Sequence, residues 1–383
     1  MNLLIDYSFK GSEGLNQIRE NLTKVLSQSK REGWNICILT CKNQSLPGKE
    51  NSNLTYLSTD FEVNTWFNKW VWTNFIFPKF LFRNNIDVLY SFHSNITTRI
   101  RKNVGVIITI NNMLPFTREK MAKPRFFSLT KLRNLLLKHY YIKGIRLADA
   151  VVLHSHHSFN ILQEYSPFLK DKVYIALTGV PFDIKFNLSG MTPHPNNGKK
   201  FFFYFSSIFP YKNHLNLIYA YSAALKEKDL PDLLFAGIPG EKKYLDKILK
   251  SIRELMIEDK VRYLGTIDRE LVPSLIYHAE ANFFASTCET NPVILTEIME
   301  NKGVITCSHM PPMPEIVKYA GMYFDPHSIQ SIKETIIKIV DHPLKTQEMK
   351  NLAYQRAKEL DWTDCENKIW EAVTASKNRF NPS

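Results

Sequence analysis

The sequence predicts an α/β protein built from two doubly wound domains, and three observations support this. The chain has 383 residues, which exceeds the length at which a single hydrophobic core usually stops growing. Short runs rich in β-branched and aromatic residues alternate with helical runs, and a polar stretch near the middle interrupts this alternation before it resumes. Each half therefore predicts a mostly parallel sheet with helices on both faces.

The first half, residues 1–185, reads as one Rossmann-like domain. Its strand candidates are the runs at 2–6, 35–40, 86–91, 104–110, 150–155 and 172–177, and its clearest helical runs are 13–32 and 126–147. The segment "NLSGMTPHPNNGKK" at 187–200 is rich in Pro, Gly and Asn, which predicts a linker over 186–200.

The second half, residues 201–362, repeats the pattern. Its strand candidates are the runs at 201–206, 232–237, 261–266, 281–286, 303–308 and 322–326. Its helical runs are 213–228, 241–256, 269–280, 292–301, 328–340 and 345–360. A last helical run at 363–377 lies in a C-terminal segment, 363–383, that we expect to be able to cross back to the first domain. The two domains are expected to face a central ligand cleft.

The charge of the chain is strongly asymmetric. Residues 1–185 hold 25 Lys and Arg against 13 Asp and Glu, whereas residues 186–383 hold 24 against 24. The first half is therefore expected to face an anionic partner such as a membrane surface, a lipid-linked phosphate or a nucleic acid.

The sequence also indicates a cytoplasmic protein. No apolar run approaches the roughly 20 residues that span a bilayer, and the N-terminus lacks the features of a secretory signal. The five cysteines form no CxxC pair and leave an odd count, which favours reduced thiols and argues against a zinc site.

Two acids in "CETNPVILTEIME" form the main candidate site. Thr290 or Asn291 can cap a helix that starts with Pro292 in its first turn, so Glu289 precedes this helix and Glu297 lies inside it. Carboxylates bind sugar hydroxyls, and a helix N-terminus binds phosphate, so the pattern fits a nucleotide sugar. For an isolated pair of acids, an exposed loop and a solvated helix face are the alternative.

The longer stretch "CETNPVILTEIMENKGVITCSHMPPMPEIVKYAGMYFDP" resembles the C-terminal signature of the GT-B glycosyltransferases of retaining family 4. The resemblance implies a hexosyltransferase that uses a nucleotide-sugar donor, with Glu289 at the donor sugar and Glu297 at the ribose. It also implies that the residues between the two acids lie against the donor: Thr290, Asn291, Pro292 and Val293.

A second segment, "YFSSIFPYKNHLNLIYAY" at 204–221, resembles the family's strand–loop–helix that places an Arg and a Lys on the donor diphosphate. Lys212 matches the Lys, but Ser207 stands where the family has the Arg. Such cations offset the charge of the leaving diphosphate, so the resemblance implies an enzyme without metal or cofactor, and the missing Arg puts donor affinity in question.

The first half carries weaker resemblances. "FKGSEGLNQIRENL" resembles the family's glycine loop, with Gly11 and Gly14 at the N-domain side of the cleft. "TINNMLPF" looks like a segment of transferases that assemble bacterial surface polysaccharides such as lipopolysaccharide O-antigen and capsule, and it would place Asn111 and Asn112 in the cleft. The implied acceptor is a glycan, usually linked to a lipid. No histidine is identified as a general base.

The first half also combines aromatic and basic residues at high density. Residues 61–82 hold nine aromatics, and residues 117–148 hold nine Lys or Arg against one acid. The run at 126–147 is either a helix that lies on anionic lipid or a core helix with a solvated basic face. Attachment to the inner face of the cell membrane is expected. Nucleic-acid binding is the rival, although no RNP, KH or helix-turn-helix motif is present.

Two other functions remain open. The first is a nucleotide-sugar 2-epimerase of the same fold. The second is a non-catalytic binding protein that lost activity together with the Arg replaced by Ser207. The donor is a GDP-, UDP- or dTDP-hexose, and the sequence selects neither the base, the sugar, the linkage nor the oligomeric state.

Overall fold

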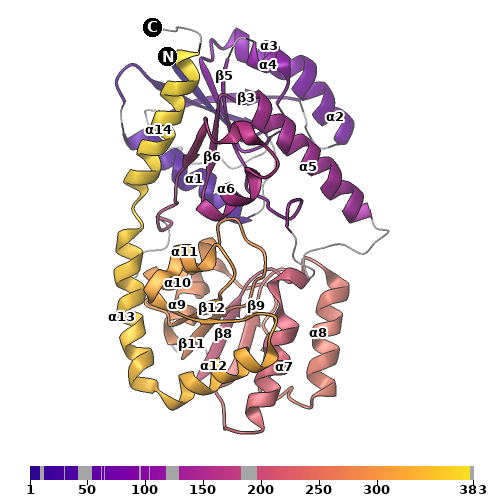
Figure 1. Cartoon of the computed structure of the whole chain (residues 1–383), viewed down its shortest axis with the longest axis vertical. Coiled ribbons are helices and arrows are strands. Elements are labelled where there is room, and N and C mark those ends of the chain that lie inside the picture. The colour runs from indigo at the N-terminus through magenta and orange to yellow at the C-terminus, as the bar shows by residue number, and fades with distance from the viewer. Residues whose placement is uncertain are drawn as a thin grey trace. The chain divides into compact units, whose positions relative to one another are not determined.

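The computed structural model of the chain (Figure 1) divides into two compact units. It describes residues 1–8, 13–29, 31–41, 54–61, 63, 65–94, 96–102, 104–117, 129–182 and 196–379. Unit 1 comprises Met1–Phe116, Pro124–Thr178 and Asp361–Ser383, and unit 2 comprises Thr117–Lys123 and Gly179–Leu360. Most of the expected linker, up to residue 195, lies outside the described residues.

Unit 1 contains a parallel seven-stranded sheet. Its strands are β1 (Asn2–Asp6), β2 (Asn35–Cys41), β3 (Leu54–Thr59), β4 (Val88–Ser91), β5 (Gly105–Thr109), β6 (Ala150–Leu153) and β7 (Val173–Ile175), in the spatial order β3-β2-β1-β4-β5-β6-β7. The six strands expected from the sequence are present, and β3 is an additional edge strand that pairs with β2.

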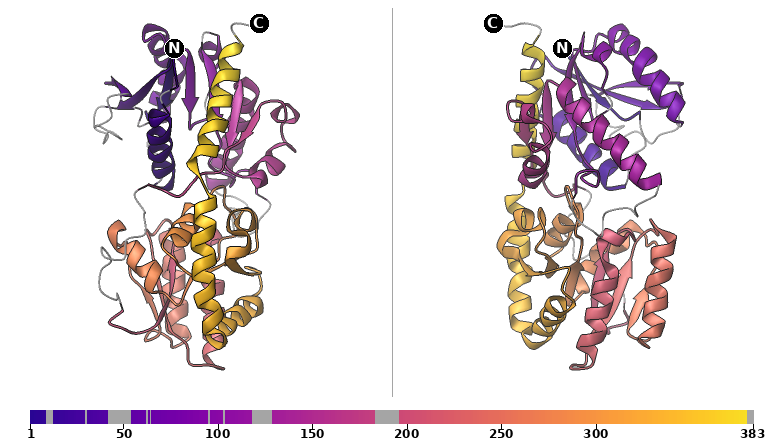
Figure 2. Two further views of the ribbon diagram at one scale, coloured as in Figure 1. Left: turned by 90° about the vertical axis from the view of Figure 1, so that its left-hand side faces the viewer. Right: turned by 45° about the vertical axis from the view of Figure 1, so that its right-hand side comes forward.

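Helices cover both faces of this sheet. They are α1 (Glu13–Gln28), α2 (Trp66–Val71), the π-helical turn η1 (Trp72–Ile76), α3 (Phe77–Arg83), α4 (Thr98–Arg101), α5 (Leu129–Leu147), α6 (His156–Leu162) and α14 (Trp362–Asn378). Helices α1 and α14 contact each other, and Figure 2 (left) shows both in the foreground of unit 1. The connection from β1 to β2 runs toward one edge of the sheet, whereas the connections from β3 to β4, β5, β6 and β7 run toward the other edge. Right-handed connections that run in opposite directions place their helices on opposite faces, so α2 to α6 cover the face opposite α1.

Helix α14 is an integral part of unit 1. It packs on β5, β6 and β7, and its residues Ile369, Trp370 and Val373 are buried. The contact with β5 is close, because a Cβ at Gly105 would lie 2.6 Å from the backbone oxygen of Ser376. The last helix thus completes the core of the first unit.

Unit 2 contains a parallel six-stranded sheet. Its strands are β8 (Phe201–Phe205), β9 (Asp232–Ala236), β10 (Val261–Tyr263), β11 (Ala281–Phe284), β12 (Ile305–Ser308) and β13 (Gly321–Phe324), in the order β10-β9-β8-β11-β12-β13. All six were expected from the sequence. Strands β8 and β11 lie at the centre, and the chain order reverses between them.

The helices of unit 2 form two groups, one on each face. They are α7 (His214–Leu225), α8 (Lys242–Glu254), α9 (Val272–His278), α10 (Val293–Glu300), α11 (Met313–Val317), α12 (Ile329–Asp341) and α13 (Pro343–Glu359). Helix α7 contacts α8 and α12, while α10 contacts α9, α11 and α13. Figure 2 (right) shows α7 beside α8. The four inner strands β8, β9, β11 and β12 between the two groups are almost completely buried, as is typical of parallel sheets.

One local expectation was wrong, and one stays a prediction. Gly14 lies in the first turn of α1, within the helical run expected over 13–32, and a Cβ at this position would meet no atom of the described residues within 4 Å. Its expected place at the N-domain side of the cleft stays a prediction. Gly11 lies outside the described residues. Helix α10 begins at Val293 with Pro292 as its N-cap, and no side chain caps it, so neither Thr290 nor Asn291 has the expected capping role.

Candidate active site

The candidate site lies at the carboxyl edge of the unit 2 sheet, where β8 and β11 end. These strands are hydrogen-bonded neighbours, with Phe202 opposite Ala281, but the chain leaves them toward opposite sides of the sheet. In open α/β sheets the loops separate at such a switch point and ligands bind between them. The segments that carry Lys212 and Glu289 follow these two strands.

Hydrogen bonds tie the two loops together. The backbone N–H of Thr287, after β11, donates to the carbonyl oxygen of Tyr211 at 2.8 Å, and the hydroxyl of Thr287 donates to the same oxygen at 3.2 Å. In the first loop, the hydroxyl of Tyr204 donates to the carbonyl of Lys212 at 2.6 Å. Asn213 then adopts a left-handed conformation, with φ of 61°, and its side-chain amide donates to the carbonyl of Pro326 at 2.7 Å. The position of Lys212 is thus fixed on both sides.

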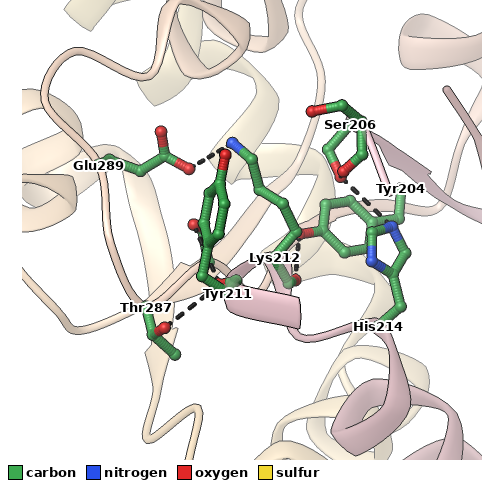
Figure 3. A network of polar contacts seen from close by, with 9 residues as sticks. Tyr204, Ser206, Tyr211, Lys212, His214, Thr287 and Glu289 are labelled. Atoms are coloured by element: carbon green, nitrogen blue, oxygen red, sulfur yellow. Dashed lines mark hydrogen bonds and ion pairs between the residues drawn. The ribbon is translucent and has the colours of Figure 1, made fainter. Parts of the chain in front are cut away.

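Lys212 and Glu289 form an ion pair between the two loops (Figure 3). Their side chains are only 13% and 12% exposed. The ammonium group also lies 5.1 Å from the ring centroid of Phe284, the last residue of β11. Figure 3 shows the Lys212 side chain reaching across toward the Glu289 carboxylate. The sequence predicted both residues for the site, and the structure brings them together.

Glu297 belongs to a second ion pair that the sequence did not predict. Glu297 lies in the second turn of α10 and is buried, with a side chain 3% exposed, and its carboxylate pairs with the guanidinium of Arg269. Arg269 comes from a short 3-10 segment, Arg269–Leu271, between β10 and α9, and is 33% exposed. Because burial penalises an unpaired charge, Arg269 stabilises the ionised form of Glu297 and restricts its orientation.

The other predicted donor-binding residues lie in the same loops. Ser207 follows β8, and Thr290 to Val293 connect β11 to α10. Thr290 is buried. The backbone N–H of Val293 already donates to the carbonyl of Asn291 at 3.0 Å, so it is not the free donor that the sequence analysis expected.

Burial holds the remaining titratable groups of the site in their neutral forms. The buried imidazole of His214 stacks on Tyr204 at 4.5 Å between ring centroids, and its Nε2 lies 3.3 Å from the hydroxyl of Ser206. Burial, together with the charge of Lys212, lowers the pKa of His214 to about 3. Burial and, secondarily, the charge of Glu289 raise the pKa of Tyr211. The charged members of these loops are therefore the Lys and the Glu.

The predicted N-domain residues belong to unit 1. Asn111 and Asn112 follow β5. The side-chain oxygen of Asn112 accepts from the backbone N–H of Leu114 at 3.0 Å. Burial raises the pKa of Tyr141 to about 12, and Arg133 and a hydrogen bond with Asn112 oppose this rise. Both polar atoms of the Asn111 amide are buried and have no hydrogen-bond partner among the residues that the structure describes. Asn111 is thus the better candidate for binding a ligand.

Two histidines near strand ends, His93 and His154, have lowered pKa values. The Nδ1 of His154 lies 2.8 Å from the carbonyl of Ala176, and burial lowers its pKa. Burial, with Arg19 and Lys69 as lesser causes, also lowers the pKa of His93 to about 3. In the described part of the chain, no three His, Cys, Asp or Glu residues gather where they could hold a metal ion.

Comparisons with known proteins agree with this architecture. Residues 192–356 match the family described as glycosyl transferases group 1. A curated relative, O-antigen chain mannosyltransferase B of Escherichia coli, is 26% identical over 164 residues, and the match spans 42% of this chain and 42% of the relative. The chain therefore spans less than half the length of the curated relative it matches.

Solved structures match over almost the whole chain. A glycosyltransferase from Rickettsia africae superposes with a TM-score of 0.72 at 15% identity and covers 98% of both chains. Anabaena HepE in complex with UDP and glucose gives 0.73 at 15% identity, over 98% of this chain and 100% of HepE. WaaG, a glycosyltransferase involved in lipopolysaccharide biosynthesis, gives 0.70 at 13% identity, over 98% of this chain and 100% of WaaG. The chain thus has the GT-B fold, with two Rossmann-like units, and its residues 192–356 are similar to the group 1 glycosyl transferases.

Proposed function

We propose that this protein is a retaining hexosyltransferase that moves a hexosyl group from a nucleotide sugar to a glycan acceptor in surface polysaccharide biosynthesis. The observation that carries this proposal is the Lys212–Glu289 ion pair at the switch point of unit 2, followed by the buried Glu297 on the next helix. The pair places the Lys212 ammonium, which can bind a diphosphate, next to the Glu289 carboxylate, which can accept hydrogen bonds from sugar hydroxyls.

Each residue has a separate role in this proposal. Lys212 binds the donor diphosphate, with the hydroxyl and backbone of Ser207 in support. Glu289 accepts hydrogen bonds from the hydroxyls of the transferred sugar, and Glu297 accepts them from the ribose. Arg269 keeps Glu297 ionised and oriented. A diphosphate that enters the site competes with Glu289 for the ammonium of Lys212.

The transfer itself exchanges one bond at the anomeric carbon for another. The bond from this carbon to the diphosphate oxygen breaks, a bond to the acceptor hydroxyl oxygen forms on the same face, and the leaving diphosphate accepts the hydroxyl proton. Lys212 stabilises the charge that develops on the diphosphate, a role that needs neither a metal nor a cofactor. A protein general base is not required.

The donor is a GDP-, UDP- or dTDP-hexose. The name of the E. coli relative points to mannose, and the HepE complex holds UDP and glucose, so both sugars belong in the first screen. A thermal-shift assay separates the bases, because a ligand at one hundred times its Kd adds about 2.7 kcal/mol to the free energy of unfolding.

The acceptor is a lipid-linked or oligosaccharide glycan, which the enzyme meets as a cytoplasmic protein attached peripherally to the inner face of the membrane. No helix in the described part of the chain has both the length and the apolar content to cross a bilayer. The basic charge of residues 1–185 supports the peripheral arrangement.

Incubation with the selected donor and a lipid-linked acceptor tests the proposal directly. We expect a product whose new linkage keeps the anomeric configuration of the donor, as read by the one-bond C–H coupling at the anomeric carbon. An inverted linkage would overturn the retaining assignment. Conversion of the donor to its 2-epimer in the absence of acceptor would identify a nucleotide-sugar epimerase instead.

A non-catalytic sugar-nucleotide-binding protein is the second candidate, and Ser207 favours it because the family has an arginine there. The variant Ser207→Arg separates the two. For an enzyme that functions with one cation, we expect Ser207→Arg to lower the KM for the donor while the wild type already turns over. Donor binding without turnover in both proteins would support the non-catalytic candidate.

A further inference from the structure

Five helical segments on one face of unit 1 are rich in basic residues. The helical segments α2, η1, α3, α4 and α5 hold ten basic residues and no acidic residue. The basic residues are Lys69, Lys79, Arg83, Arg99, Arg101, Lys131, Arg133, Lys138, Lys143 and Arg146. All five segments lie on the face of the sheet opposite α1 and α14, by the crossover argument above. We call this face, with its exposed apolar side chains, the basic-aromatic surface.

Four aromatic side chains protrude from this face. Phe67, Trp70, Phe75 and Phe82 are 62%, 46%, 43% and 71% exposed. The first three form a cluster, since the Trp70 ring stacks on Phe67 at 6.3 Å and meets the edge of Phe75 at 5.3 Å. The guanidinium of Arg99 lies 4.8 Å from the centroid of the Phe75 ring. The cluster thus combines rings and a cation at the protein surface.

The same segment is anchored firmly in the domain. Trp72 is fully buried and stacks on Phe77 at 5.3 Å and on Phe61 at 5.8 Å. The buried aromatics therefore hold the segment in place. The exposed ones play no part in this core and remain available for an external partner.

Helix α5 presents leucines to solvent. Leu132, Leu135 and Leu136 are 56%, 57% and 52% exposed. They continue along the helix into the exposed residues His139 and Lys143 at intervals of three or four. Ile145, on another side of the same helix, is fully buried, so α5 has both a packed side and an exposed apolar stripe. The two interpretations of this run, a core helix with a solvated basic face and a helix on anionic lipid, therefore both stay open until lipid binding is measured.

We propose that the basic-aromatic surface docks on an anionic lipid bilayer, with its Phe, Trp and Leu side chains in the headgroup region and its Lys and Arg side chains beside lipid phosphates. Aromatic residues favour the membrane interface, and each cation near an anionic surface adds to the affinity. This inference rests on the peripheral attachment in the proposed function and names the surface that makes it, but it depends on no step of the transfer reaction.

The composition of the surface favours lipid over single-stranded nucleic acid. Nucleic-acid surfaces use aromatic rings as free stacking platforms for bases. Here the rings of Phe67, Trp70 and Phe75 pack on one another, and three exposed leucines offer no stacking face. Apolar side chains of both kinds, flanked by cations, match the interfacial helices that lie in bilayers.

Sedimentation of the full chain with vesicles tests the proposal. The probes are vesicles of phosphatidylcholine alone and of phosphatidylcholine with phosphatidylglycerol, measured without donor or acceptor. We expect binding to the anionic vesicles that weakens as salt is added, and little binding to the neutral ones. A single-stranded RNA is titrated in parallel. Equal binding to both vesicles, none to either, or preference for the RNA would overturn the proposal.

Two sets of variants locate the surface. The triple variant Phe67→Ser/Trp70→Ser/Phe75→Ser is expected to weaken vesicle binding by at least about tenfold, because apolar area is no longer transferred to the bilayer. The matched control replaces three exposed apolar residues of unit 2, Met256→Ser/Ile329→Ser/Leu344→Ser, and is expected to bind like the wild type. Equal losses in both variants would refute the assignment.

The charge variants follow the same design. Lys69→Gln/Lys79→Gln/Arg83→Gln removes three exposed cations and is expected to weaken binding about a hundredfold, at about fivefold per cation. The control Lys243→Gln/Lys247→Gln/Lys250→Gln removes the same charge from exposed positions of α8. Donor binding, which is measured separately by thermal shift, should be unchanged in all four variants, so a failed docking surface and a failed donor site give different results.

Discussion

The Lys212–Glu289 ion pair leads to a prediction that separates donor binding from sugar transfer. The variant Glu289→Gln keeps the shape of the side chain but removes its charge. In the proposed role, the carboxylate accepts a charge-assisted hydrogen bond from the donor sugar, which is worth about 1.5–3 kcal/mol. We therefore expect kcat to fall about 10- to 150-fold.

Nucleotide binding is expected to respond differently. In the wild type the diphosphate competes with Glu289 for Lys212, and the neutral amide of the variant competes less. The Kd for the nucleoside diphosphate should therefore stay the same or decrease. Because the side chains of Lys212 and Glu289 are 13% and 12% exposed, water can hydrate the ammonium group that the variant leaves unpaired. The free energy of unfolding should therefore fall by only about 1–2 kcal/mol.

Isothermal titration with the nucleoside diphosphate and steady-state kinetics with the whole donor measure the two effects. Glu280→Gln is the matched control, because Glu280 pairs with Lys200 at 3.5 Å just before β11, at the opposite end of the same strand. If the Kd of the Glu289 variant rose in parallel with the loss of kcat, the assignment of this carboxylate to the sugar would be refuted.

Three further predictions follow from the described contacts. Arg269→Ala should raise the Kd for the nucleotide about tenfold, because it releases the Glu297 carboxylate that Arg269 orients. The control Arg262→Ala breaks the ion pair of Arg262 with Asp232, the first residue of β9, and should leave this Kd unchanged. Equal Kd values for the two variants in calorimetric titrations would count against the positioning role of Arg269. Asn111→Ala should leave thermal stability unchanged and raise the KM for the acceptor. Asn112→Ala should lower the free energy of unfolding in urea by about 1 kcal/mol, because it loses a hydrogen bond from a backbone amide. A large loss of stability in the Asn111 variant would contradict its assignment to ligand binding. The pKa of His214 is lowered to about 3 in the folded protein, so between this value and pH 6.5 the unfolded chain binds one more proton than the folded one, and the free energy of unfolding falls as the pH is lowered. In urea unfolding, His214→Phe should therefore recover about 1 kcal/mol of the stability that the wild type loses between pH 7 and pH 5.5. If the variant lost as much stability as the wild type over this range, the imidazole would not titrate on unfolding.

The strands could be predicted well because parallel strands are continuous apolar runs. The run from Phe201 to Phe205 is a clear example. Strand β3 was missed because it is an edge strand whose residues are mostly half-buried, and its sequence "LTYLST" carries too little apolar periodicity. The start of α10 was misplaced because Thr290 and Asn291 are both favoured N-cap residues, yet the helix starts without a side-chain cap.

The candidate site was only partly visible in the sequence. Glu289 and Glu297 are close in sequence, so their spacing on one loop and helix could be interpreted directly. Arg269 could not be found in this way, since it precedes Glu297 by 28 residues and reaches it only through the packing of α9 beside α10. The exposure of Leu132 was equally hidden, because a helix with a buried apolar stripe and a helix with an exposed one share the same periodicity.

The return of α14 to unit 1 has a consequence for the order in which the protein can fold during synthesis. The ribosome releases Met1–Thr178 first, but the face of β5, β6 and β7 that α14 covers stays open until Asp361–Ser383 emerges. Unit 2, which is almost wholly continuous in sequence as Gly179–Leu360, can complete its own core earlier. The nascent first half must therefore keep an apolar sheet face uncovered while about 180 further residues are added, at roughly 5–20 residues per second. Chaperone contacts during that interval should concentrate on this half of the chain.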